Sequence, residues 1–205
     1  MKKFFCMLIV FVAFFSFLPA KTVNDVFKSD EVFFYGLDLT KVKLTGSDGF
    51  RNKREIVDKY FIAWNQLLYK EQSKYDIAKF FRKNVEYKLD MIEKLNIEVS
   101  TKDLVIETSF SLSPEDIDES VKKYPLKEKD GLGLILVVEN LNKFSESGTF
   151  YIVFFDIASR NVLVSEKVVG SAGGIGFRNY WAKVFYSGLK NGYEAFDSWE
   201  NKYSK

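Results

Sequence analysis

The chain has 205 residues, with 30 Lys and Arg against 28 Asp and Glu, and 17% of its residues are aromatic. It contains one cysteine, Cys6, and no histidine, which excludes a structural disulfide and removes the commonest general base and zinc ligand. The balanced charge gives no electrostatic reason to expect a nucleic-acid partner. No Asp-rich calcium loop is present, so we expect no metal and no cofactor.

The first 20 residues have the layout of a secretory signal peptide. Lys2 and Lys3 form a positive start, residues 4–17 are almost entirely apolar, and Ala20 supplies a small residue at a cleavage point. The alternative is a retained anchor, but a membrane span needs about 20 apolar residues and this run is shorter. We therefore expect cleavage near Ala20, a periplasmic or secreted protein, and no stable membrane span in the mature chain.

Residues 21–205 are interpreted as one domain, and the first half of it mixes strands with helices. Strands are expected over residues 31–35, 39–45 and 85–89, where β-branched and aromatic residues cluster or alternate. Apolar residues at steps of three and four predict a helix over 53–69 and a shorter one over 74–82. Ser113 followed by Pro114 is typical of a helix start.

The second half predicts three strands, a glycine-rich turn and a long terminal helix. The strands are expected over 132–138, 149–157 and 161–169, the turn over 170–176, and the helix from there to residue 203. Strands joined by short links are most often antiparallel neighbours. We therefore expect an α+β fold, in which an antiparallel sheet is covered on one face by the 53–69 helix and the long C-terminal helix.

The glycine-rich turn is the one local pattern that could hold a ligand. Its backbone N–H groups, helped by Arg178, could bind an anion at the start of the helix. The spacing matches neither the dinucleotide fingerprint nor the phosphate loop, so we favour a structural turn with positive φ at its glycines and Trp181 buried beneath it. The binding candidates are Gly173, Gly174, Gly176, Arg178, Tyr180 and Trp181.

Two acidic residues near the last hairpin offer a catalytic alternative. Asp156 ends one expected strand and Glu166 lies on the next, so a tight hairpin could bring them together. Paired carboxylates can divide the acid and base roles of a hydrolase. Isolated acids near a hairpin are far more often solvated, so no residue is assigned as catalytic.

Four segments resemble a group of small exported bacterial proteins of unknown function: 33–38, 131–139, 154–157 and 173–181. More loosely, residues 151–170 look like the strand–turn–strand of envelope proteins related to the curli secretion lipoprotein and the N-terminal domain of the Tol translocation protein. The resemblance implies a bacterial envelope protein and carries over no functional residue. We expect a non-catalytic module that binds an envelope protein or glycan; the alternative is a carboxylate-based hydrolase of envelope glycans.

Overall fold

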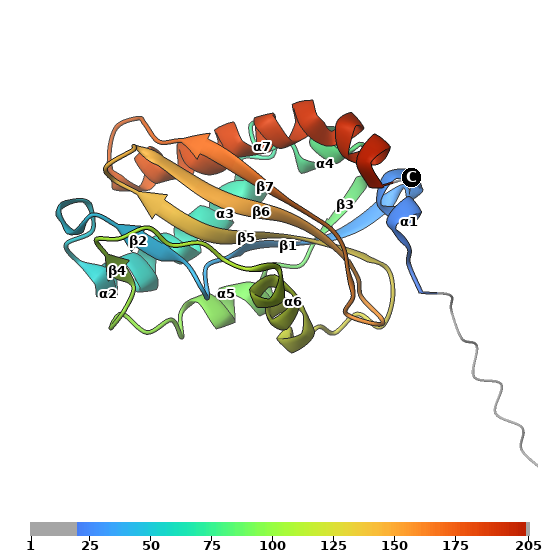
Figure 1. Ribbon diagram of the computed structural model, residues 1–205, viewed down its shortest axis with the longest axis horizontal. Coiled ribbons are helices and arrows are strands. Elements are labelled where there is room, and N and C mark those ends of the chain that lie inside the picture. The colour runs from blue at the N-terminus through green and yellow to red at the C-terminus, as the bar shows by residue number, and fades with distance from the viewer. Residues whose placement is uncertain (1–19, 204–205) are drawn as a thin grey trace, which may run out of the picture.

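Helices cover both faces of a seven-stranded sheet in the computed structural model of the chain (Figure 1), which describes residues 20–203. The signal-peptide prediction and Cys6 lie outside the described residues. The strands are β1 (Glu31–Asp38), β2 (Lys43–Thr45), β3 (Asn84–Tyr87), β4 (Val105–Ile106), β5 (Leu132–Asn142), β6 (Ser147–Asp156) and β7 (Val162–Ser171).

The longer helices agree best with those predicted from the spacing of apolar residues. They are α1 (Val23–Lys28), the 3-10 turn η1 (Ser47–Gly49), α2 (Lys53–Glu55), the π-helical η2 (Ile56–Phe61), α3 (Ile62–Lys70), α4 (Ile77–Phe81), α5 (Asp90–Asn96), α6 (Pro114–Lys123) and α7 (Phe177–Tyr203). The run α2–η2–α3 occupies the expected helix of residues 53–69. Ser113 caps α6 as predicted, with its side chain accepting a hydrogen bond from the backbone N–H of Asp116.

The prediction of an antiparallel α+β sheet is wrong. Four of the six strand pairings in the described residues are parallel: β1 with β3, β1 with β5, β2 with β4, and β2 with β5. Only β5 with β6 and β6 with β7 run antiparallel, through the short links that the sequence shows. The architecture is therefore α/β with a mixed sheet. The helices between β1 and β3 form a crossover, and such a connection returns the next strand in the parallel direction.

Strand β5 lies at the centre of the sheet and has three partner strands. One edge faces β6, while the other is shared by β1, opposite Gly133–Val137, and by β2, opposite Asn140–Asn142. The chain leaves the sheet between β1 and β2. There Asn65 accepts a hydrogen bond from the Leu37 N–H at 2.7 Å, and Asn96 accepts one from the Leu39 N–H at 2.8 Å. The buried side-chain amides of Asn65 and Asn96 thus accept hydrogen bonds that the carbonyl groups of a neighbouring strand would otherwise accept.

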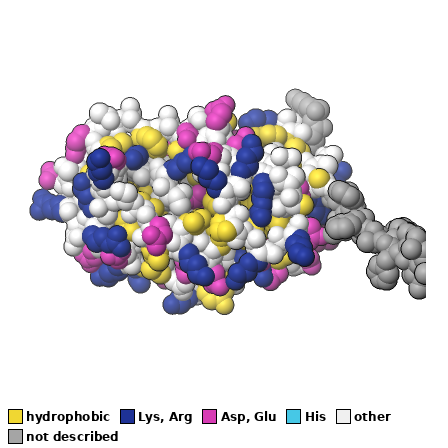
Figure 2. All heavy atoms as spheres, turned by 90° about the horizontal axis from the view of Figure 1, so that it is seen from below, with side chains coloured by type: hydrophobic (Ala, Val, Ile, Leu, Met, Phe, Trp, Pro, Cys, Tyr) yellow, Lys and Arg dark blue, Asp and Glu magenta, His cyan; other side chains and the backbone are white. Residues whose placement is uncertain are grey.

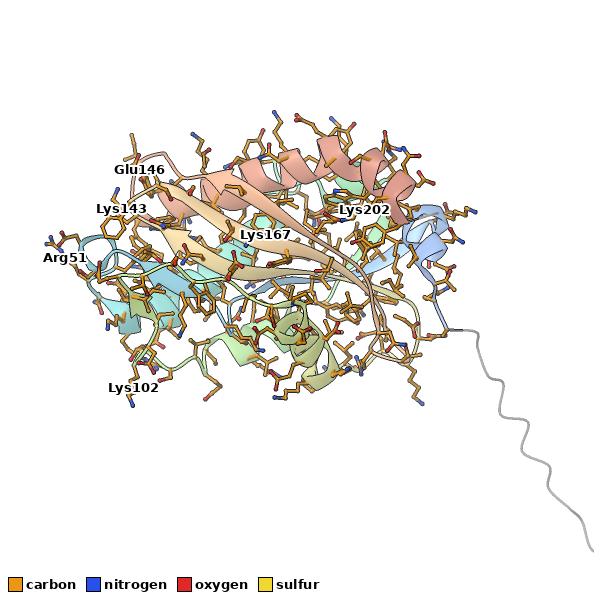
Figure 3. All side chains as sticks on the ribbon, viewed as in Figure 1. Arg51, Lys102, Lys143, Glu146, Lys167 and Lys202 are labelled. Carbon is orange, nitrogen blue, oxygen red and sulfur yellow. The ribbon has the colours of Figure 1, made fainter. Side chains whose placement is uncertain are left out.

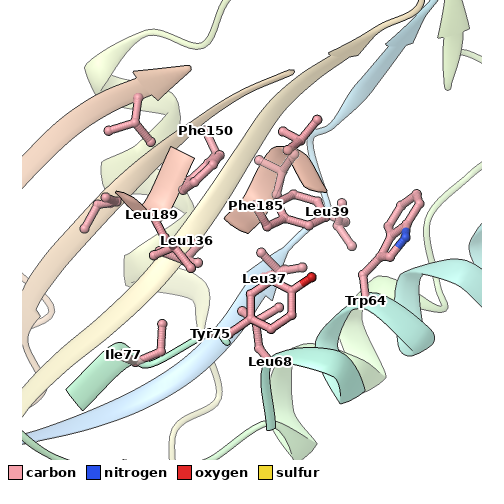
Figure 4. Close-up of a cluster of buried hydrophobic side chains, with 14 of the residues drawn as sticks. Leu37, Leu39, Trp64, Leu68, Tyr75, Ile77, Leu136, Phe150, Phe185 and Leu189 are labelled. Atoms are coloured by element: carbon pink, nitrogen blue, oxygen red, sulfur yellow. The ribbon is translucent and has the colours of Figure 1, made fainter. Parts of the chain in front are cut away.

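The hydrophobic core forms two clusters, one on each face of the sheet. The larger one joins the sheet to α3, α4 and α7, and it contains Trp64, Leu136, Phe150 and Phe185 among the side chains drawn in Figure 4. The smaller one lies under α5 and α6. The helices were expected on one face only, and this second cluster corrects that prediction.

Helix α7 crosses the sheet at very close range. A Cβ placed on Gly170 of β7 would lie 1.9 Å from the carbonyl oxygen of Val184, and one placed on Gly188 would lie 2.4 Å from Phe150. At Gly170 only glycine permits this approach of backbone to backbone, whereas at Gly188 the neighbouring atoms belong to the Phe150 ring. The same packing holds the start of α7, and with it the glycine-rich turn, at one end of the sheet (Figure 1).

Candidate functional site

Three loops meet at the end of the sheet where α7 begins, and we call this region the loop end. They are the turn around η1 (residues 46–51), the β5–β6 turn (143–146) and the glycine-rich turn (173–177). Arg51, Lys143 and Glu146 mark this end in Figure 3. Two of the loops are tied together, since the N–H of Ala172, just before the glycine-rich turn, donates to the carbonyl of Glu146 in the β5–β6 turn at 2.7 Å.

The glycine-rich turn has the backbone that the sequence predicts. Gly173, Gly174 and Gly176 have φ of +151°, +108° and +80°, a region that other residues rarely adopt. The N–H of Gly173 donates to the carbonyl of Tyr180 at 2.9 Å, so the fold itself uses this donor. The contact supports a structural turn over an anion cradle.

Trp181 is buried beneath the turn, as expected, with 1% of its surface exposed. Its ring stacks on Phe50 at 4.8 Å between centroids, and Phe50 comes from the loop around η1. Phe177 adds an edge contact with Phe50 at 6.1 Å and lies 4.6 Å from Tyr60. These aromatic contacts anchor two of the three loops on one rigid base.

A shallow cavity of about 280 Å³ opens above this base. Four of the six predicted binding residues line it: Gly174, Gly176, Tyr180 and Trp181. Gly173 and Arg178 do not line it. The Arg178 side chain instead donates to Asn179 at 3.1 Å, and its carbonyl accepts from the Trp64 indole at 3.0 Å.

Lys143 supplies the charge at the cavity wall. Its ammonium donates to the Tyr180 hydroxyl at 3.1 Å and to Glu146 at 3.0 Å, and it lies 4.7 Å from the centroid of the Tyr180 ring. The hydrogen bonds with Tyr180 and Glu146 raise the pKa of Lys143 above its ordinary value. The group is therefore a fixed cation rather than a base.

Two large apolar side chains project from the loops beside the cavity. Ile175, between Gly174 and Gly176, is 93% exposed, and Phe144, next to Lys143, is 69% exposed. Neither side chain lines the cavity, but each is next in the chain to residues that do. Exposed apolar side chains that lie near a cavity are candidates for an interaction surface. We did not predict either residue. An apolar side chain inside a polar turn, or between two glycines, is the signal that could have identified them.

The proposed acid pair does not form. Glu166 pairs across the sheet with Ile152, four residues from Asp156 on the same strand, which corresponds to about 13 Å along the strand. Glu166 is bound to Lys202 at 2.5 Å, while Asp156 accepts backbone N–H groups. Within residues 20–203, no group of three or more Asp, Glu, Cys or His side chains is placed to hold a metal ion.

Another hollow, of about 530 Å³, lies between α5 and the segment that follows α6. Some of its polar groups are paired: the Tyr35 hydroxyl donates to Glu128 at 3.0 Å, and Lys88 lies 3.6 Å from the same carboxylate. Asp90, Lys94 and Lys127 also line it. Figure 2 shows basic and acidic side chains interspersed on the face seen from below, without a field of one sign.

Comparisons with known proteins give little guidance. No protein-family model matches the chain, and no curated protein matches it. A solved structure from Helicobacter pylori, described as a neuraminyllactose-binding hemagglutinin homolog, is 14% identical and has a TM-score of 0.35, over 91% of this chain and 96% of that one. A TM-score this low establishes no common fold. In the part of the chain that the structure describes, every helix is too short or too polar to cross a membrane.

Proposed function

We propose that the protein is an exported, non-catalytic module that binds a protein of the bacterial envelope through the loop end. The observation that carries this proposal is the exposure of Ile175 and Phe144 on loops held by a buried aromatic base. Export rests on the leader-like first 20 residues.

The chemistry of the loop end favours a protein partner over a glycan. Ile175 offers an aliphatic group, which can fill an apolar pocket but cannot stack on a sugar ring. Tyr180 and Lys143 are already bonded to each other, so the free polar groups that a glycan requires are few. A rigid base also lowers the entropy lost when loops bind a partner.

The hydrolase alternative finds less support in the geometry. Glycoside hydrolysis by two carboxylates requires a separation of roughly 5–10 Å across an open cleft. Asp156 is 1% exposed and Glu166 is held by Lys202, so neither side chain faces a cleft.

The test is a comparison of variants in the native cell. The tagged full-length chain is cross-linked in the intact envelope and captured as wild type, as the double variant Phe144→Asp/Ile175→Asp, and as Tyr69→Asp. Tyr69 is a matched control because it is 49% exposed and lies on α3, away from the loop end.

We expect wild type and the control to capture the same protein. The amount captured by the double variant should fall at least about tenfold, since each buried apolar anchor contributes about 2 kcal/mol or more. Equal capture by the double variant, or capture of polysaccharide alone, would contradict the proposal.

A further inference from the structure

Asp156 is a buried carboxylate at the end of β6, where the chain turns into β7. It is 1% exposed. One carboxylate oxygen accepts a hydrogen bond from the backbone N–H of Ser159 at 2.8 Å, and the other accepts one from the backbone N–H of Lys21 at 3.1 Å. Among residues 20–203, no Lys or Arg side chain lies within 4.0 Å of it. A buried charge without a counter-ion is costly, so this carboxylate is poised to accept a cation.

The backbone nitrogen of Lys21 is held in place by the helix that follows it. Thr22 and Asp25 form a reciprocal cap at the start of α1. Val26 of α1 is fully buried, and Phe27 lies 5.4 Å from Phe196 of α7. Figure 1 shows α1 beside the C-terminal end of α7. The position of Lys21 is thus fixed by contacts on its C-terminal side.

We propose that Asp156 is the binding site for the chain's own α-ammonium group, created at Lys21 when the leader is removed; this rests on the export proposed above. Hydrolysis of the Ala20–Lys21 peptide bond adds a hydroxyl to the Ala20 carbonyl carbon and a proton to the Lys21 nitrogen. The products at neutral pH are a carboxylate and an α-ammonium group. The nitrogen that donated as a neutral amide then carries a positive charge beside Asp156.

The new charge strengthens an existing contact without moving the chain. Hydrogen bonds between charged groups are about twice as strong as neutral ones. Burial raises the pKa of Asp156, but the hydrogen bonds from Ser159, Lys21 and Ala158 outweigh it and the pKa is lowered. The carboxylate is therefore ionised when the ammonium forms, and removal of the leader stabilises the folded mature chain.

The sign of the pH dependence follows from the two partners. The folded state lowers the pKa of Asp156 and, in the ion pair, raises that of the α-amine above its ordinary value of about 8. The added stability is present from about pH 4 to about pH 8. It is lost as the carboxylate is protonated at lower pH or the ammonium is deprotonated at higher pH.

The test compares chains with defined first residues, each released from a cleavable fusion without extra residues. One chain begins at Lys21 and the other at Ser16, which leaves the Ala20–Lys21 bond intact and moves the charge five residues away. Both are also made with Asp156→Asn. At pH 7 we expect the Lys21 chain to melt at least about 2–4 °C higher. This difference should disappear with Asp156→Asn and above about pH 10.

Equal melting temperatures of the two wild-type chains at pH 7, or a difference that survives Asp156→Asn, would overturn the ion pair. The intact mass of the protein from the native envelope tests the export separately. A mass that includes residues 1–20 would mean a retained anchor and would contradict cleavage, whereas the melting comparison is independent of the cell.

Discussion

The ammonium group of Lys167 lies 2.6 Å from Oε2 of Glu139, a side chain that is only 2% exposed. Glu139 sits at the irregularity of β5 between Val138 and Asn140. It also accepts hydrogen bonds from the Leu112 N–H at 2.8 Å and the Thr149 hydroxyl at 2.7 Å. One carboxylate therefore fastens the segment before α6 to the central strands.

Removing the cation of this pair is expected to destabilise the fold. Burial lowers the pKa of Lys167, but the hydrogen bond and charge of Glu139 outweigh it and the pKa is raised, so the pair is ionic at neutral pH. Lys167→Met leaves a buried carboxylate without its counter-ion. Because Lys167 is 40% exposed, we expect a loss of about 1–2 kcal/mol rather than that of a fully buried pair.

Urea denaturation measures this loss, with the exposed Lys190→Met as control. A loss for Lys167→Met no larger than that of the control would contradict the role of the pair.

Alanine substitutions at Gly170 and Gly174 are expected to differ in how much they destabilise the fold. Gly170→Ala places a Cβ 1.9 Å from the Val184 carbonyl, and neither backbone can yield easily, so we expect a loss of about 3 kcal/mol or more. At Gly174 the nearest atom is 3.7 Å away, and only the φ of +108° opposes a side chain. Gly174→Ala should therefore cost about 1 kcal/mol. Chemical denaturation of both variants checks this order, and a larger loss for Gly174→Ala would refute the close-approach argument.

The buried amine of Lys83 makes a contribution to the free energy of unfolding that increases with pH. The side chain is 5% exposed and donates to the Ser29 carbonyl at 2.6 Å. Burial lowers its pKa to about 8, against an opposing effect of the charge on Asp30. The unfolded chain keeps the proton up to about pH 10.5, so the folded state gains stability as pH rises through this window.

Relative to Lys83→Met, wild type should gain about 2–3 kcal/mol of unfolding free energy between pH 7 and pH 10. Unfolding titrations of both proteins at matched pH values measure the gain. A constant difference between them across this range would show that Lys83 does not titrate in the folded state.

The sequence predicts which segments form strands better than it predicts how they pair. Short links identify the β5–β6–β7 order because each strand turns back on its neighbour. The partners of β1 are instead Asn84–Tyr87 and the first half of β5, which lie far along the chain. The helices between β1 and β3 were predicted, and weighing them as a crossover would have indicated a parallel pair.

The candidate site was predictable where it depends on the local backbone. Glycines with positive φ and a buried Trp181 follow from a strand, a turn and a helix in sequence. The contribution of Phe144 was not predictable, because it depends on the β5–β6 turn folding beside the glycine-rich turn. The strand register places Glu166 opposite Ile152, four residues from Asp156. The sequence does not specify this register, so the separation of the two acids was not predictable.

Site-specific photo-cross-linking in living cells tests most directly the claim that the loop end contacts a protein. A photoreactive phenylalanine analogue replaces Ile175, Phe144 or, as the control, Tyr69 in the full-length chain. We expect one discrete protein adduct from positions 175 and 144, and no such adduct from position 69. An adduct of equal yield at all three positions, or adducts at position 69 alone, would contradict this claim.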